Sequence, residues 1–153
     1  MALGDHLRGF PDLPPLWLLG TMAASTLLGR TGIGASGGWA HTAGGVLIAL
    51  GLALIGWAAL WFRRKRTPIE PHHAPTALIV EGPYRLGRNP IYLALVLIAV
   101  GYGLRQPSVL ALLPPPALWW VLDRRFARIE EDRLRAAFGA AAEPFLRGTR
   151  RWL

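Results

Sequence analysis

The sequence predicts an all-α integral membrane protein with about four transmembrane helices, the last two paired as a helical hairpin, and a cytoplasmic C-terminal helix. Two observations predict this class. Apolar residues make up 52% of the 153 positions, and they lie in long uncharged runs rather than in an amphipathic pattern. The basic residues, 17 Lys and Arg against 9 Asp and Glu, gather beside those runs. A chain of this length has room for one domain, so residues 1–153 are expected to form a single unit.

The uncharged runs are 13–28, 39–62, 91–104 and 109–122. A spanning helix needs roughly 20 apolar residues, which only the second run meets comfortably. Its Trp39 and Trp61 would stand about 33 Å apart at 1.5 Å per residue, as an interfacial aromatic pair does. The other three runs are short, so each needs tilt or local thinning of the bilayer. In the second run Gly45, Ala49 and Ala53 recur every four residues and predict a smooth stripe for close helix packing.

The placement of charge predicts the orientation. Of the Lys and Arg residues, only Arg30 and Arg105 fall between the first and second runs or between the third and fourth. The positive-inside rule therefore puts both termini and the central loop, 63–89, in the cytoplasm. We expect a multi-pass protein of a bacterial inner membrane, with the lipid bilayer as its partner. Nucleic-acid binding is not expected, because the basic residues flank spans and no reader motif accompanies them.

The first run has an alternative interpretation as the apolar part of a cleavable signal peptide, because it is short and small residues follow it. Its basic leading segment is weak, with only His6 and Arg8 beside two aspartates. We therefore prefer a retained helix. Cleavage would leave the orientation of the remaining chain unchanged.

Three consecutive prolines, Pro114–Pro116, lie inside the fourth run. They remove three backbone donors and break regular helix geometry. The third and fourth runs are expected to pair as an antiparallel hairpin that is kinked here, and whether the segment fully crosses the bilayer stays open. Beyond the run, 123–139 predicts a charged helix that Gly139 ends, with Leu122, Phe126 and Ile129 on one face.

The segment 81–92, EGPYRLGRNPIY, predicts a polar loop at the end of a helix that enters the membrane. Gly82-Pro83 and Asn89-Pro90 are turn signals, and Pro90 is well tolerated as the first helical residue. Free backbone N–H groups, a guanidinium able to bind a carboxylate at two points, and aromatic faces suit a charged, flat cofactor. With no cysteine and only the adjacent His72 and His73 nearby, no metal site is expected.

Glu130 and Glu131 allow two interpretations. They could form surface pairs along a helix, Glu131 with Arg135 and Glu130 with Arg133. Alternatively, because neighbouring residues on a helix point about 100° apart, one carboxylate could face a cofactor while the other orients an arginine or a hydroxyl. Spacing alone does not decide between them.

The stretch TPIEPHHAPTALIVEGPYRLGRNPIYLALVLI, followed by IEEDRLRAAFG and a terminal RRWL, resembles the isoprenylcysteine carboxyl methyltransferase family. That family is related to the membrane phospholipid N-methyltransferases. The resemblance covers roughly residues 66–153, and its ordered set of motifs is specific where a lone Gly-Pro-Tyr would not be.

The resemblance implies S-adenosyl-L-methionine as cofactor, bound at the cytoplasmic face. Residues 1–62 would form two N-terminal spans, and 63–153 the cofactor-binding core. Within that core Arg88, Tyr92 and Glu130 would be the catalytic residues. The cofactor contacts implied are Leu78, Ile79 and Val80 on the adenine side, Gly82, Pro83 and Tyr84 around the loop, Arg88, Asn89 and Tyr92 near the methionine part, and Glu130 and Glu131 on the nucleoside or the positive charge. Arginine suits the carboxylate of this cofactor, and carboxylates suit its cationic groups and hydroxyls.

The sequence departs from the family pattern at several positions. Asn89 stands where many relatives carry histidine, Ala94 where glycine is usual, and Ala142 and Phe145 where tyrosines are common. A carboxylate acceptor needs no base, whereas a thiol must ionise and an ammonium must lose a proton. Without an evident strong base, the sequence favours a carboxylate or a readily ionised acceptor, with His72, His73 and Tyr84 as the remaining candidate bases.

The sequence therefore predicts a membrane methyltransferase that uses S-adenosyl-L-methionine and acts on a lipidic or isoprenoid-type acceptor, whether carboxylate, thiol or amine. A non-catalytic small membrane protein, either a transporter subunit or a scaffold, is the alternative. The uncharged runs carry no ionisable group of the kind that ion-coupled transporters use. An enzyme of the same fold that methylates a small soluble thiol also stays open.

Overall fold

The computed structural model describes residues 12–34, 37–66 and 77–153, and these ranges contain helices and no strands. The main helices are α1 (Pro14–Gly29), α2 (Gly38–Lys65), α3 (Pro90–Leu104), α4 (Pro114–Leu122), α5 (Arg128–Phe138) and α6 (Glu143–Gly148). Short 3₁₀ turns are η1 (Gly82–Arg85), η2 (Val109–Leu112) and η4 (Gly139–Ala141), and η3 (Asp123–Ala127) is a π-helical turn. The all-helical class is confirmed for this part of the chain, and His72 and His73 lie outside it.

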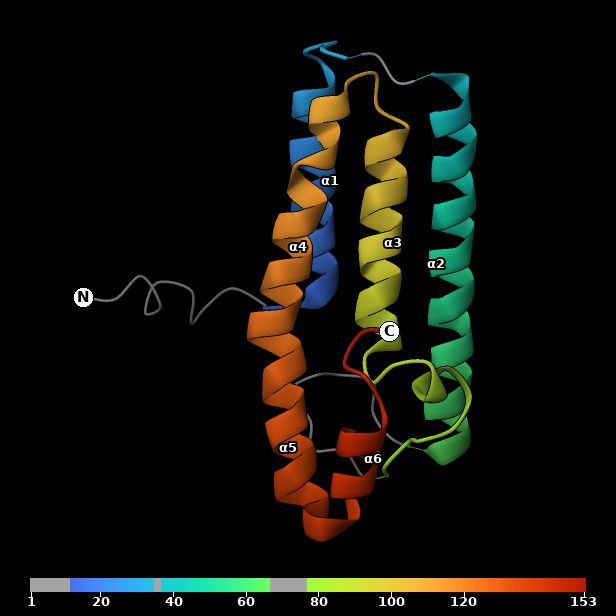
Figure 1. Cartoon of the computed structure of the whole chain (residues 1–153), viewed down its shortest axis with the longest axis vertical. Coiled ribbons are helices and arrows are strands. Elements are labelled where there is room, and N and C mark those ends of the chain that lie inside the picture. Colours follow the sequence, from blue (N-terminus) through green and yellow to red (C-terminus); the bar gives the residue numbers. More distant parts are fainter. Residues whose placement is uncertain (1–11, 35–36, 67–76) are drawn as a thin grey trace, which may run out of the picture.

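The long helices form an upright bundle with α3 at its centre. α2 packs on one side of α3, and the neighbouring helices α1 and α4 pack on the other (Figure 1). The turn η1 and the helices α5 and α6 gather at one end of the bundle, beside the end of α2 that carries Arg63 and Arg64.

Of the described helices, α2 is the one that is long and apolar enough to cross a bilayer. Its 28 residues span about 42 Å, whereas the 16 residues of α1 and the 15 of α3 span about 24 and 22 Å. Large apolar side chains on α2, including Val46, Leu50 and Leu60, point away from the bundle and are exposed. A four-span arrangement is therefore not established by helix length.

Small residues bring α2 and α3 into close contact. The buried positions of α2 are Ala40, Gly44, Gly51 and Ala58. A Cβ at Gly44 would lie 2.4 Å from the carbonyl oxygen of Gly101 on α3, so the two backbones touch there. The stripe expected from the sequence, Gly45, Ala49 and Ala53, is wrong: Ala49 and Ala53 are exposed. Small residues occur around most of α2, so their spacing alone does not identify the packed face.

The prolines of the fourth run open a helix rather than interrupt one. The run divides into η2 and α4, and Pro114 is the first residue of α4. The first turn of a helix does not use its backbone N–H groups, so proline is tolerated there. The predicted break is confirmed, and its location explains why α4 is regular beyond it.

The helix continues from α4 through η3 into α5 without a loop. The π-helical turn η3 fits an extra residue into one turn, which rotates everything that follows it. Leu122 and Phe126 are buried, whereas Ile129 is 46% exposed. The three residues expected on one face therefore differ in their burial. Gly139, at φ 52°, ends α5 as predicted.

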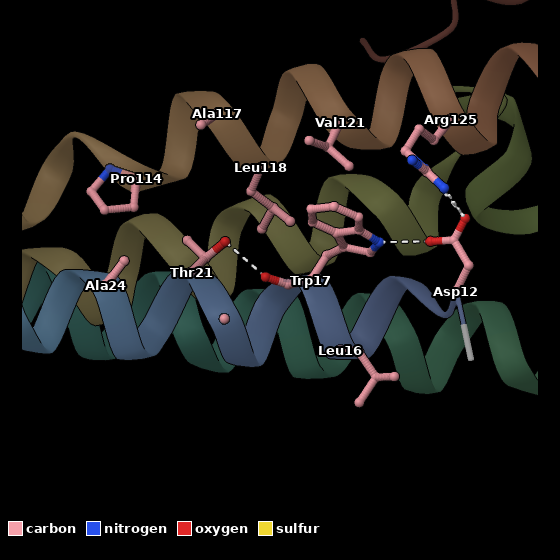
Figure 2. A pocket seen from close by; sticks show the side chains of 11 residues that line it. Asp12, Leu16, Trp17, Thr21, Ala24, Pro114, Ala117, Leu118, Val121 and Arg125 are labelled. Atoms are coloured by element: carbon pink, nitrogen blue, oxygen red, sulfur yellow. Dashed lines mark hydrogen bonds and ion pairs between the residues drawn. The ribbon is translucent and has the colours of Figure 1, made fainter. Parts of the chain in front are cut away.

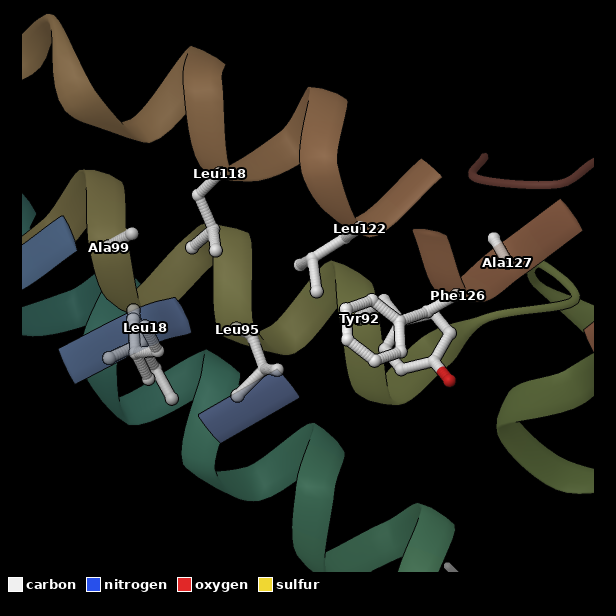
Figure 3. Packing of buried hydrophobic residues seen from close by; sticks show 9 residues of the cluster. Leu18, Tyr92, Leu95, Ala99, Leu118, Leu122, Phe126 and Ala127 are labelled. Carbon is white, nitrogen blue, oxygen red and sulfur yellow. The ribbon is translucent and has the colours of Figure 1, made fainter. Parts of the chain in front are cut away.

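A buried cluster holds α1, α3 and α4 together. Leu18 of α1, Leu95 of α3 and Leu118 of α4 meet in it (Figure 3). Beside them the rings of Tyr92 and Phe126 pack with their centroids 6.1 Å apart. This contact fixes the start of α3 against η3, and so positions both elements that carry the candidate site.

Candidate functional site

The turn η1 is fixed by a glycine that has no room for a side chain. Gly82 has φ 61°, and a Cβ there would overlap the indole of Trp61. Tyr84, two residues later, is buried, and its ring packs edge-on against Phe62 at 6.0 Å between centroids. Burial, together with the negative charge of Glu130, raises the pKa of the Tyr84 hydroxyl. The loop predicted to shape the site is thus anchored on the end of α2.

Arg88 lies between this loop and the C-terminal segments. Its Nη1 donates a hydrogen bond to the Leu146 carbonyl oxygen at 2.8 Å, and its Nη2 lies 3.4 Å from the carboxylate of Glu131. Its Nε is buried and makes no hydrogen bond to any described residue. Burial lowers the pKa of Arg88, and the charge of Glu131 opposes that shift. A buried N–H donor without an acceptor is costly, so this atom is the candidate hydrogen-bond donor of the site.

Glu131 forms a bidentate ion pair with Arg151 near the end of the chain. Arg151 Nε and Nη2 donate to its two carboxylate oxygens at 2.6 and 2.9 Å, and Glu131 is 5% exposed. Arg135, the surface partner that spacing allows, instead contacts Asp132 and Glu143. Glu131 therefore ties α5 to the C-terminal tail and to Arg88.

Asp123 is a second anchor for the tail. It accepts hydrogen bonds from Arg128 Nε at 3.0 Å, Trp152 Nε1 at 3.1 Å and Arg151 Nη1 at 3.3 Å. Burial acts to raise the pKa of Asp123, but these hydrogen bonds and the charge of Arg151 outweigh it and leave the pKa below its usual value. Sequence reasoning did not select Asp123, Arg151 or Trp152, although the terminal RRWL motif marks the last two.

Glu130 faces a different environment from its neighbour. Burial raises the pKa of the Glu130 carboxyl group, while its hydrogen bond with the Tyr92 hydroxyl and the charge of Arg133 oppose that rise. The predicted site residues Tyr84 and Tyr92 thus meet Glu130, and Arg88 meets Glu131. These five residues come from η1, the loop before α3, the first turn of α3 and α5.

Asn89 and Gly87 hold the tail against the loop. The Asn89 side-chain Nδ2 donates to the Arg151 carbonyl oxygen at 3.1 Å, and the Arg88 backbone N–H donates to Arg150 at 2.8 Å. A Cβ at Gly87 would lie 2.0 Å from the Trp152 carbonyl oxygen. The tail therefore crosses directly over the loop, at a point where only glycine fits.

The residues expected on the adenine side lie in or beside an apolar cluster. Ile79 is buried in a cluster with Ala58 of α2 and with Ala142 and Phe145, the two positions that depart from the family pattern. Leu78 is partly buried against this cluster, whereas Val80 is 38% exposed. This apolar wall borders Tyr84, which belongs to the same cluster.

The site fits the chemical groups of S-adenosyl-L-methionine. The buried Arg88 Nε would donate to the amino-acid carboxylate, and Glu130 offers an anion to its cationic groups. The apolar wall around Ile79 and Tyr84 suits a flat aromatic base. Within the described ranges, no group of three or more His, Cys, Asp or Glu residues is arranged to hold a metal ion.

Comparison with known proteins places this geometry in a family. Neither curated proteins nor solved structures gave a match to the chain. A family model described as phospholipid methyltransferase matches residues 39–141, more than half of the chain, and this range includes the loop, α3 and both glutamates of α5. The chain belongs to the phospholipid methyltransferase family, a family of membrane methyltransferases.

Proposed function

We propose that the protein transfers a methyl group from S-adenosyl-L-methionine to a lipidic or isoprenoid-type acceptor at the cytoplasmic face of the membrane. The observation that carries this proposal is the buried, unpaired Nε of Arg88, whose guanidinium contacts Glu131, next to the partly buried Glu130. A hydrogen-bond donor for a carboxylate and an anion for a cation then lie beside an apolar wall. We name the group formed by Arg88, Tyr92, Glu130, Glu131 and Arg151 the donor site.

Each residue of the donor site has a distinct task in this proposal. Arg88 Nε–H binds the carboxylate of the donor molecule, and Glu130 in its ionised form balances the donor's positive charge. The Tyr92 hydroxyl orients Glu130. Arg151 acts through Glu131, whose position it fixes, and is therefore a positioning residue. When bound, S-adenosyl-L-methionine supplies an electrophilic methyl group for an in-line displacement, and positioning accounts for much of the rate.

The character of the acceptor follows from the bases available. Burial raises the pKa of Tyr84, so its phenol stays protonated at neutral pH and is a poor proton acceptor. Asn89 has no basic group, and its amide already bonds the tail. These features support an acceptor that reaches the site ionised, such as a carboxylate. A lipidic acceptor would approach sideways from the bilayer.

The proposal includes a four-span arrangement in a bacterial inner membrane, with the termini and the donor site in the cytoplasm. The cytoplasmic ends of α2, α3 and the α4–α5 helix lie at the same end of the bundle (Figure 1). Since α1 and α3 are shorter than the roughly 30 Å hydrocarbon core, they require a locally thinned bilayer. Many of the large side chains on the outer surface are apolar, which suits contact with lipid.

Isothermal titration of the purified protein with S-adenosylhomocysteine tests the donor site. We expect binding by the natural chain, and binding weakened at least about tenfold in Arg88→Ala and Glu130→Gln, as loss of a charged hydrogen bond predicts. Arg147→Ala, which removes a guanidinium with an 83% exposed side chain, is the matched control and should bind normally. Unchanged binding in both site variants would reject the residue assignment. No binding at all would favour the non-catalytic scaffold or transporter subunit.

The acceptor is tested by supplying methyl-labelled S-adenosyl-L-methionine to membranes that contain the protein. We expect label in the organic-soluble fraction, released by mild alkali if the product is a methyl ester. An amine or thioether product would keep its label under alkali. Label confined to a small aqueous thiol would instead support the soluble-substrate alternative.

A further inference from the structure

A groove of about 440 Å³ lies between α1 and α4, on the outside of the bundle (Figure 2). Its long walls are apolar and include Leu16 and Ala24 from α1 and Ala117 and Val121 from α4. Its volume is within the range of small-molecule sites. None of its lining residues belongs to the donor site.

One end of the groove is polar and charged. Arg125 contacts Asp12 through Nη2 at 2.7 Å and Nε at 3.3 Å, and Trp17 Nε1 donates to the other Asp12 oxygen at 2.8 Å (Figure 2). The guanidinium also lies 5.6 Å from the centre of the Trp17 ring. The Arg125 side chain is 41% exposed, so this ion pair is screened by solvent and weak. A guanidinium has five donors, so Arg125 can bind a second anion without losing Asp12.

The length of the groove matches one leaflet of a bilayer. From Pro114 to Arg125, both of which line it, the helix rises about 16 Å. The hydrocarbon core is about 30 Å thick, so one leaflet accounts for about half of that. The groove therefore runs from the cytoplasmic interface to near the bilayer centre, with its cation at the interface. This is the geometry of one acyl chain below its headgroup.

We propose that this groove binds one anionic phospholipid of the cytoplasmic leaflet, with an acyl chain between α1 and α4 and the phosphate on Arg125. An anionic headgroup is favoured over a zwitterionic one because both Asp12 oxygens already accept hydrogen bonds, so Arg125 offers further donors to a phosphate while Asp12 offers less to a lipid ammonium. α1 lies outside the matched range 39–141, so half of the groove comes from beyond the family's shared region. The proposal concerns lipid retention, so it stands or fails separately from methyl transfer.

Fluorescence quenching by brominated lipids tests the proposal, because Trp17 lines the groove. The purified full chain is placed in dioleoyl phosphatidylcholine nanodiscs that contain small fractions of brominated phosphatidylglycerol or brominated phosphatidylcholine. The signal lost in Trp17→Phe isolates Trp17 from the other tryptophans. We expect phosphatidylglycerol to quench Trp17 at about fivefold lower mole fraction than phosphatidylcholine, the ratio that one interfacial cation supplies.

Three variants separate a built site from general attraction of anionic lipid. Arg125→Gln should abolish the preference for phosphatidylglycerol, and Arg124→Gln, with the same change of charge at an exposed neighbour, should keep it. Ala117→Phe should fill the groove and reduce quenching by both lipids. Equal quenching by both lipids in the natural chain, or equal losses in the two arginine variants, would overturn the proposal. So would full displacement by inorganic phosphate, because the acyl chain would then play no part.

Discussion

Glu130 and Glu131 are adjacent in sequence, yet α5 directs their carboxyl groups to different partners. Glu131 is committed to Arg151 and Arg88, which hold it in place. Glu130 lies beside a tyrosine hydroxyl in a partly buried environment that favours its protonated form. The residue types and their adjacency could be read from the sequence. Their separate tasks could not, because Arg151 reaches Glu131 only through the folded tail.

The raised pKa of Glu130 predicts a pH-dependent affinity for the donor molecule. The ionised carboxylate is the form that binds a cation, so affinity for S-adenosyl-L-methionine should rise with pH until Glu130 is ionised. Below that point it should fall about tenfold per pH unit. Titration calorimetry from pH 5 to 8 measures this slope, which Glu130→Gln should remove, leaving at every pH the low affinity of the protonated carboxyl group. A midpoint at or below the ordinary value of 4.5 would contradict the prediction.

The raised pKa of Glu130 also affects stability, and this effect weakens as pH rises, whereas donor affinity strengthens. A carboxyl group with a raised pKa holds its proton more tightly in the folded chain, so its contribution to folding is present below pH 4.5 and declines as pH rises through the folded pKa. Glu130→Gln, which is neutral at every pH, should therefore be at least as stable as the natural chain at pH 7. Thermal unfolding followed by tryptophan fluorescence measures this, and a lower midpoint for the variant would contradict it.

The contribution of Asp123 to stability has the opposite dependence on pH. Because its pKa is lowered, its contribution is present at neutral pH and is lost as pH falls through and below its ordinary value of 3.8. Asp123→Asn keeps the size of the side chain but removes the charge that Arg128 and Arg151 contact, at a cost of about 2 kcal/mol in unfolding free energy. Thermal unfolding at pH 7 measures the loss. The control Asp132→Asn removes a charge whose side chain is 78% exposed and should change stability by less than about 0.5 kcal/mol.

At the scale of elements, the sequence predicted where the helices lie along the chain better than which face of each helix packs inward. Uncharged runs and turn prolines placed α1 to α4 within a few residues. The π-helical turn η3 has no sequence signature of its own, and beyond it Ile129 is exposed while Leu122 and Phe126 are buried. The small residues of α2 likewise left its packed face undecided, because the choice depends on where α3 lies. The docking of the C-terminal tail was also missed, since it depends on contacts far apart in sequence.

Replacing Gly87 with alanine, which adds one methyl group, should displace the C-terminal tail from the loop. In Gly87→Ala the new Cβ would overlap the Trp152 carbonyl oxygen, so the tail must leave the loop and take Arg151 from Glu131. We expect S-adenosylhomocysteine affinity to fall more than about tenfold. Trypsin should also cleave after Arg150 and Arg151 much faster in this variant.

The matched control for this change is Gly148→Ala, a nearby glycine whose added Cβ meets nothing within 4 Å. Its donor affinity and its cleavage rate should match those of the natural chain. Equal behaviour of the two variants would show that Gly87 is not required by the crossing tail. Rapid cleavage with unchanged affinity in Gly87→Ala would show instead that the tail does not position the donor site.

At the scale of the whole molecule, uncharged runs separated by basic loops were enough to predict a helical bundle with its charged end on one side. They could not predict the groove between α1 and α4, because its walls come from runs that are about 90 residues apart. They also left the number of crossings open. Three of the four runs are short, and the bilayer thickness around them is a property of the assembly of protein and lipid.

The four-span arrangement predicts which positions a membrane-impermeant thiol reagent can reach in intact cells. The chain has no cysteine, so single substitutions report one position each. Arg30→Cys lies at the end of α1 on the outer side, whereas Arg85→Cys and Leu153→Cys lie on the cytoplasmic side with the donor site. All three positions are exposed. We expect labelling of Arg30→Cys in intact cells, and labelling of the other two only after the membrane is permeabilised. Labelling of Arg85→Cys from outside would place the donor site on the wrong face for a cofactor made in the cytoplasm, and would contradict the topology.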